Sequence, residues 1–147
     1  MGARVKLCSV VFVVMLVAPG NVFGQPAAMV PGASQVVESG HLVVAVSHSG
    51  NTVYAYSDYT GQWAKVAVEP GATKPIRQVV GEEVACFVSG TKAYAFGARS
   101  GQWVVADLHE HGIPVVNATR VRIDVQSRIY LFSTSSKKWA IVDLSKD

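Results

Sequence analysis

The chain has 147 residues, of which 50% are hydrophobic and 16% are charged, and its formal net charge is +3. This composition excludes an intrinsically disordered protein, and the length suits a single domain with a sizeable hydrophobic core. Lysine and arginine are not concentrated in a patch interleaved with aromatic residues, so no nucleic-acid partner is expected.

The first 24 residues are predicted to be a secretory signal peptide. Arg4 and Lys6 precede an apolar run over residues 7–18, which Pro19-Gly20 ends shortly before the small residue Gly24. A basic start, a short apolar run and a small residue at the end are typical of a signal peptide that is cleaved, here near Gly24–Gln25. The run is shorter than the about 20 residues that a membrane-spanning helix needs.

Removal of the signal peptide would leave 11 basic and 10 acidic residues, a net charge of +1. We therefore expect a secreted or periplasmic protein with no membrane span after cleavage, in which residues 25–33 form an N-terminal linker. Cys8 would leave with the signal peptide, and Cys86 would stay alone in the apolar segment 84–88. A lone cysteine in an apolar strand is usually a small buried hydrophobic residue.

The rest of the chain contains an internal repeat. The segment NTVYAYSDYTGQW at 51–63 matches TKAYAFGARSGQW at 91–103, and SRIYLFSTSSKKW at 127–139 is a third copy in the same register. A fixed repeat of this length indicates one supersecondary unit per copy. The repeats divide a β domain over 34–147 into units of about 34–70, 71–110 and 111–147.

Each unit is predicted to contain four short antiparallel strands. β-branched runs are followed by Ser-Gly, then by an alternating aromatic strand, then by Thr60-Gly61 or Ser100-Gly101, as in successive hairpins. No segment has the apolar period of an amphipathic helix. Apart from the aromatic repeats, the predicted strands cover residues 34–38, 41–48, 62–68, 75–80, 83–88, 102–108, 113–117 and 137–144.

The repeated aromatic pairs also resemble those of a known architecture. A Tyr or Phe is followed seven residues later by Trp in the pairs Tyr56–Trp63, Phe96–Trp103 and Phe132–Trp139. This pattern across a turn resembles the blade motif of kelch-type β-propellers, and Tyr-Ala-Tyr followed by Thr-Gly is similar to quinoprotein-type blades. The resemblance implies an all-β, propeller-like fold of three four-stranded repeats. The alternative is a β-trefoil, because three units and twelve strands suit that architecture too.

Three blades are fewer than a closed propeller uses, since such rings contain four to eight. A sheet at either end would then lack a neighbour, which favours association. We therefore expect either a homodimer that closes a six-blade ring or an extracytoplasmic partner.

The sequence contains few residues that suggest chemistry. Asp107, His109 and His111 are weak candidates for a metal site, because His-x-His in a strand places both imidazoles on one side. A solvated loop between the second and third units is the favoured interpretation of this cluster. No nucleophile elbow and no phosphate-binding glycine loop is present, so we predict no catalytic residue and no cofactor.

The repeated aromatic residues are either core residues or ligand contacts, because aromatic faces both pack between units and stack on sugars. We expect the three tryptophans at equivalent, mostly buried positions. The function predicted from these features is a secreted, non-enzymatic binding or protein-interaction module, with glycans as one candidate ligand. A purely structural or assembly protein is the alternative, and a hydrolase is a more distant one. The residues concerned are Tyr54, Trp63, Tyr94, Trp103, Tyr130 and Trp139.

Overall fold

The computed structural model describes residues 33–69 and 76–146, and the predicted signal peptide and most of the linker lie outside them. Within these ranges the chain forms twelve strands in three sheets, followed by a short 3-10 helix, η1. The first sheet contains β1 (Ala33–Ser39), β2 (Leu42–Ser47), β3 (Thr52–Ser57) and β4 (Gln62–Ala67). The second contains β5 (Gln78–Val80), β6 (Val84–Ser89), β7 (Lys92–Gly97) and β8 (Gln102–Asp107). The third contains β9 (Pro114–Val116), β10 (Arg120–Val125), β11 (Arg128–Ser133) and β12 (Ala140–Asp143), and η1 covers Leu144–Lys146.

Each sheet is antiparallel, and its strands pair in the order in which they occur in the chain. The turn between the third and fourth strands contains a glycine at the same place in the first two sheets, Gly61 with φ 65° and Gly101 with φ 64°. Glycine adopts this left-handed backbone without the steric cost that a Cβ would impose. The hairpins predicted from the repeat therefore form where the glycines are.

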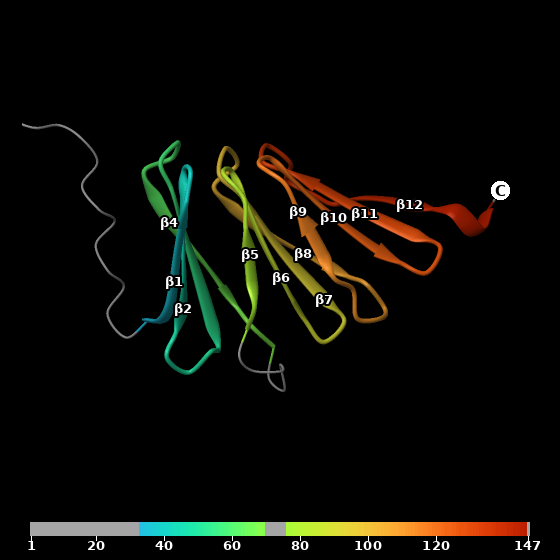
Figure 1. Cartoon of the computed structure of the whole chain (residues 1–147), viewed down its shortest axis with the longest axis horizontal. Helices are drawn as coiled ribbons and strands as arrows, with labels where there is room; N and C mark the ends of the chain where they lie inside the picture. Colours follow the sequence, from blue (N-terminus) through green and yellow to red (C-terminus); the bar gives the residue numbers. More distant parts are fainter. Residues whose placement is uncertain (1–32, 70–75, 147) are drawn as a thin grey trace, which may run out of the picture.

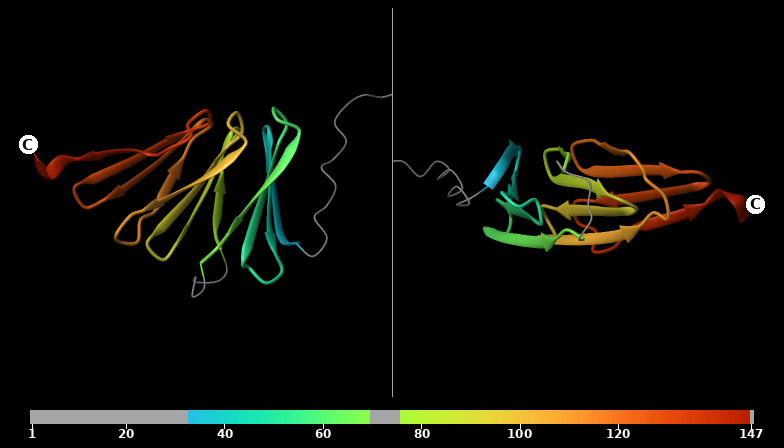
Figure 2. Two further views of the ribbon diagram at one scale, coloured as in Figure 1. Left: turned by 180° about the vertical axis from the view of Figure 1, so that it is seen from behind. Right: turned by 90° about the horizontal axis from the view of Figure 1, so that it is seen from below.

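The three sheets stand face to face and fan out from the first to the third (Figure 1). The views from behind and from below show the same succession of sheets (Figure 2). Equivalent strands of neighbouring sheets contact each other: β2 contacts β6, and β6 contacts β10. The successive sheets are therefore stacked in register, as the blades of a propeller are.

The hydrophobic core has two parts, one in each space between the sheets. The first cluster includes Val44 and Ala55 from the first sheet and Phe87, Tyr94 and Phe96 from the second. The other cluster joins the opposite face of the second sheet to residues of the third. Since successive side chains of a strand point to opposite faces, β6, β7 and β8 of the second sheet each contribute to both clusters.

These observations confirm the all-β, propeller-like prediction of three four-stranded sheets and show that the trefoil alternative is wrong. Two strands begin three residues later than predicted, since β5 begins at Gln78 and β12 at Ala140. The residues before β12 form a polar turn instead, in which the Ser136 amide donates to the Ser133 carbonyl oxygen at 2.9 Å. Among the described residues, no helix is of a length and apolarity that would let it cross a membrane.

Candidate functional site

The repeated tryptophans make the same contact between neighbouring sheets. The indole Nε1 of Trp103 in the second sheet donates to the carbonyl oxygen of Ala64 in the first sheet, at 3.4 Å. In the third sheet, Nε1 of Trp139 donates to the carbonyl oxygen of Val104 in the second, at 3.2 Å. Ala64 and Val104 each follow the tryptophan of their own sheet, so the contact repeats with the sequence. In the second and third sheets, the face that carries the tryptophan is thus the face that meets the preceding sheet.

Each tryptophan also packs against the aromatic residue seven positions before it. The ring centroids are 5.5 Å apart for Tyr56 and Trp63, 5.3 Å for Phe96 and Trp103, and 5.4 Å for Phe132 and Trp139. The two members of each of the first two pairs lie directly opposite each other on paired strands. The same local aromatic unit is therefore built in all three sheets.

The first sheet differs from the others because no described sheet covers its tryptophan face. Trp63 is 37% exposed, whereas Trp139 is 8% exposed. Within residues 33–69 and 76–146, the indole N–H of Trp63 has no hydrogen-bond acceptor, although its equivalents each have one. The expectation that all three tryptophans are mostly buried is thus wrong for Trp63, because the contact that buries the others needs a preceding sheet.

We call this outer surface of the first sheet the aromatic end face. The pairing register places five apolar or aromatic residues on this side of the sheet, of which Ala45 is buried and the others are half-buried or exposed: Val43, Ala45, Tyr54, Tyr56 and Trp63. Lys65, which pairs with Tyr54, lies on the same side and is exposed. Val36 of β1 adjoins them and is 52% exposed. An unpartnered face of this kind is unusual on a soluble domain and typically marks an interaction site.

The outer surface of the third sheet, the charged end face, has a different chemistry. Its central strand β10 presents Arg120, Arg122 and Asp124 outward, and all three are exposed. Arg122 Nη2 lies 2.8 Å from Asp124 Oδ2 in an ion pair. Leu131, which is 40% exposed, and Val142, which is 48% exposed, share this face.

The three β10 side chains replace apolar residues of the other two sheets. Leu42, Val84 and Arg120 occupy equivalent positions, because each pairs with the residue that follows the Tyr or Phe of its own sheet. By the same register, Arg122 replaces Val44 and Cys86, and Asp124 replaces Val46 and Val88. The sequence repeat alone did not reveal these substitutions, because they fall outside the three aligned segments.

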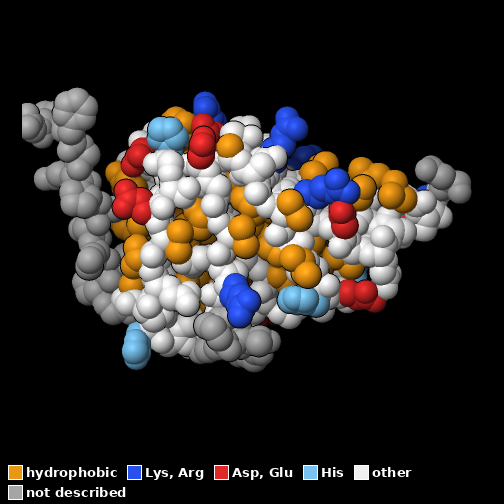
Figure 3. Space-filling view, viewed as in Figure 1, with side chains coloured by type: hydrophobic (Ala, Val, Ile, Leu, Met, Phe, Trp, Pro, Cys, Tyr) orange, Lys and Arg blue, Asp and Glu red, His pale blue; other side chains and the backbone are white. Residues whose placement is uncertain are grey.

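A polar cluster joins the first and second sheets at one end of their strands. The hydroxyl of Tyr59 donates to Glu83 Oε1 at 2.6 Å, and Arg99 donates to both Glu83 oxygens at 2.9 Å. The Arg99 guanidinium also lies over the Tyr59 ring, 4.8 Å from its centroid. Hydrogen bonds from Arg99 and Tyr59 lower the pKa of the Glu83 carboxyl to about 2, and the bond to Glu83 raises the pKa of Tyr59. Every group of this cluster has a partner, so it serves to hold two sheets together. In the space-filling view, charged and histidine side chains lie along the upper and lower edges of the visible face, and hydrophobic side chains lie between them (Figure 3).

The structure separates the residues that the sequence suggested for a metal site. His109 Nδ1 is 4.0 Å from Asp107 Oδ1, while His111 Nδ1 is 3.2 Å from the Gly90 carbonyl oxygen. In the described part of the chain, no three histidine, cysteine or acidic side chains come together. Cys86 is fully buried, and burial raises the pKa of its thiol far above the ordinary value.

Of the candidate aromatic residues, those of the second and third sheets belong to the core. Tyr94 is 2% exposed and Tyr130 is 1% exposed, and Trp103 and Trp139 pack in the same two clusters. Only Tyr54 and Trp63 of the six lie on a face that no described sheet covers.

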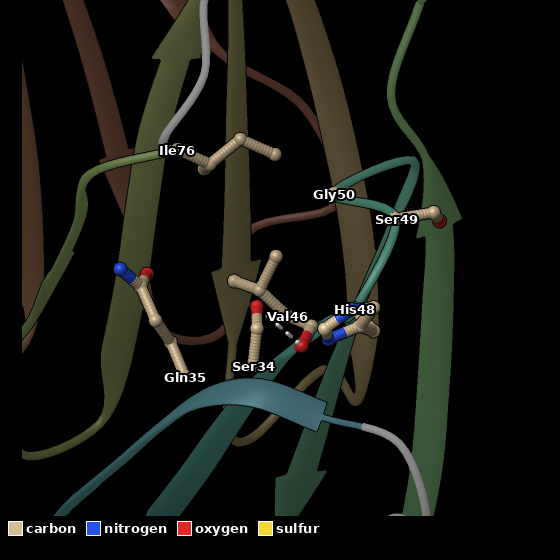
Figure 4. Close-up of a pocket in the computed structure, with 7 residues that line it drawn as sticks. All are labelled: Ser34, Gln35, Val46, His48, Ser49, Gly50 and Ile76. Atoms are coloured by element: carbon tan, nitrogen blue, oxygen red, sulfur yellow. Dashed lines mark hydrogen bonds between the residues drawn. The ribbon is translucent and has the colours of Figure 1, made fainter.

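A pocket of about 350 Å³ lies beside the turn between β2 and β3 of the first sheet, at the opposite end of its strands from Tyr59. Ser34, Gln35 and His48 contribute polar groups to it, and Val46 and Ile76 contribute apolar ones (Figure 4). The Ser34 hydroxyl donates to the carbonyl oxygen of Ser47 at 3.2 Å and is therefore already engaged. None of the described residues that line it carries a tyrosine, phenylalanine or tryptophan ring on which a sugar would stack.

Comparisons with known proteins give structural neighbours alone. No family model matches the chain, and no curated protein matches it. Among solved structures, it is similar to Kluyveromyces lactis Hsv2 with complete loop 6CD, at 11% identity and a TM-score of 0.45 over 77% of this chain. It is also similar to Kluyveromyces lactis Hsv2, at 11% identity and a TM-score of 0.33 over 78% of this chain.

The matched regions span 38% and 52% of these two neighbours' own lengths. The propeller-like arrangement described above rests on the strand pairing and sheet stacking of this chain itself.

Proposed function

We propose that this protein is a secreted, non-enzymatic protein-interaction module, and that the aromatic end face is its binding surface. The observation that carries the proposal is the 37% exposure of Trp63, whose equivalents in the other two sheets are covered by a neighbouring sheet. The secreted location rests on the predicted signal peptide.

The chemistry of the face supports a protein as the ligand. Tryptophan and tyrosine dominate the energetics of protein interfaces because they bury a large apolar area and still offer a hydrogen-bonding group. At the two internal contacts, the indole N–H is satisfied by a backbone carbonyl of the adjacent sheet. The aromatic end face is therefore shaped to receive another β-sheet, with a carbonyl oxygen opposite Trp63.

Site-specific photo-cross-linking would test this proposal. A photoreactive amino acid would be placed at position 63 of the exported protein, with the same substitution at Val105 as the matched control. Val105 is 46% exposed, and it lies on an outer strand of the second sheet, on neither end face. We expect position 63, and not position 105, to give a discrete protein adduct.

Equal or absent cross-linking at the two positions would refute the proposal. A glycan array on which binding depends on Trp63, without any protein adduct, would replace the protein ligand by a glycan.

A further inference from the structure

We infer that the partner of the aromatic end face is a second copy of this chain, which presents its charged end face. The inference rests on the proposed function, since it names the occupant of the same surface. It comes from the way in which the two end faces depart from the repeat.

The internal contacts define how such a pair of faces would meet. Equivalent strands lie over each other, since β2 contacts β6 and β6 contacts β10. Continued by one step, this stacking places β10 of one copy over β2 of the other. Arg120 and Arg122 would then lie opposite the part of the first sheet that contains Ala45 and Tyr56.

The sizes of the facing side chains are complementary under this arrangement. Between the first two sheets, a small Val44 on one central strand accompanies a large Phe87 on the other, in one cluster. Between the second and third sheets, a small Cys86 accompanies a larger Ile123. On the two end faces the order of sizes is reversed, because Arg122 takes the place of the small residue and Ala45 that of the large one. An arginine would therefore face a small residue at the position where the second sheet has a phenylalanine.

Polar groups change at matching places as well. Tyr56 takes the position of Phe96 and Phe132, so it adds a hydroxyl to the aromatic end face. Arg120 takes the position of Leu42 and Val84, and so adds a guanidinium to the charged end face. Guanidinium groups stack favourably on tyrosine and tryptophan rings. Glu38, which pairs with Val43 on the aromatic end face, is exposed and provides a carboxylate for the same guanidinium groups.

Large residues on both sides make the other pairing, aromatic face on aromatic face, a poor fit. In each internal contact, the tryptophan face meets small residues such as Val44 and Ala55, or Cys86 and Ala95. Two aromatic end faces would instead set Tyr54, Tyr56 and Trp63 against their own copies. Two aromatic-to-charged contacts related by a two-fold axis would give a closed ring of six sheets, which lies within the range that propellers adopt.

The test compares molar masses of the mature protein by light scattering over a dilution series, for the wild type and three variants. Trp63→Ala removes the largest side chain of the aromatic end face, and Arg122→Glu reverses a charge on the other face. Val105→Ala is the control that touches neither end face. We expect a dimer for the wild type and Val105→Ala, and at least a tenfold weaker association for each of the other two variants. Circular dichroism would verify that each variant is folded.

Mixing the two weakened variants identifies the faces that meet. A mixture of Trp63→Ala and Arg122→Glu retains one intact contact, so we expect association in the mixture at concentrations where each variant alone is a monomer. A dimer that survives Arg122→Glu and is lost in Trp63→Ala would overturn the inference in favour of two aromatic faces. A wild-type monomer at all concentrations would overturn it as well. A cross-link from position 63 to another protein would in that case leave the proposed function intact, whereas absence of any adduct would end both.

Discussion

The first and third sheets share a strand order and an aromatic pair, yet their outer faces have different chemistry. On the first sheet the outer face carries Tyr54, Tyr56 and Trp63. The equivalent residues of the other two sheets pack against a neighbouring sheet. On the third sheet the outer face carries the Arg122–Asp124 ion pair in place of the apolar residues found elsewhere. The repeat therefore fixes the strands, whereas the role of a face depends on what covers it.

One backbone hydrogen bond of the third sheet also differs from its equivalents in the first two sheets. The amide of His41 donates to the Glu82 carbonyl oxygen of the next sheet, and the amide of Glu83 donates to that of Ala118, both at 2.8 Å. The equivalent amide in the third sheet belongs to Thr119, and it is satisfied by the side-chain oxygen of Asn117 at 3.1 Å. In the third sheet this backbone N–H thus donates to a side chain two residues away, whereas in the other two sheets it donates to a carbonyl oxygen of the next sheet.

The largest expected effect separates a covered tryptophan from the exposed one. Trp139→Ala should lower the free energy of unfolding by about 3–5 kcal/mol, because it empties a packed space between two sheets and frees the Val104 carbonyl. Trp63→Ala should cost less than half as much, since that side chain is only partly buried. Urea unfolding followed by circular dichroism, at a protein concentration where no dimer forms, would measure both. Equal losses would contradict the distinction between the two faces.

The next effect concerns how closely the second and third sheets approach. A Cβ at Gly97 would lie 2.2 Å from the carbonyl oxygen of Thr134, so Gly97→Ala must push the two sheets apart. We expect a loss of about 1–3 kcal/mol by thermal or urea unfolding. The equivalent residue of the first sheet is Ser57, whose hydroxyl donates to the Ala98 carbonyl oxygen at 2.6 Å. Ser57→Ala should cost about 1 kcal/mol through the lost hydrogen bond. A neutral Gly97→Ala would show that the two sheets do not meet as described.

A smaller effect should follow from acid. The pKa of Glu83 is about 2 in the folded chain, below its ordinary value of 4.5, so the folded state favours the ionised form. Its contribution to stability is complete above about pH 4.5 and is lost as the pH falls towards 2. Unfolding midpoints measured from pH 6 to pH 2 should therefore fall less steeply in Glu83→Gln than in the wild type. Parallel curves would show that the contact with Arg99 and Tyr59 does not persist in solution.

The smallest effect is expected on the charged end face. Arg122 and Asp124 form a solvent-exposed ion pair, and exposed pairs contribute little to stability. Asp124→Asn should leave the unfolding midpoint of the monomer unchanged within error. A clear loss of stability would mean that this face is buried even in the monomer.

The repeat was enough to predict the fold, because the alternating aromatic strands and the turn glycines are local signals present in each copy. The exposure of Trp63 could not be predicted in that way, since its sequence surroundings match those of Trp103 and only the order of the sheets distinguishes them. The Glu83–Arg99 contact was also missed, because it joins the start of one strand to a later turn and crosses to Tyr59 of another sheet. β10 was not among the predicted strands, although its charged and apolar residues alternate, and the role of its charges depends on which apolar residues of the other sheets they replace.

The most direct test of the account is the solvent access of Trp63 as a function of concentration. Hydroxyl-radical footprinting of the protein without its predicted signal peptide, analysed by mass spectrometry over a dilution series, reports the oxidation rate of each tryptophan. The account predicts that Trp63 is protected at high concentration and becomes reactive on dilution, while Trp103 and Trp139 react slowly throughout. A Trp63 that is oxidised at the same rate at every concentration would contradict it.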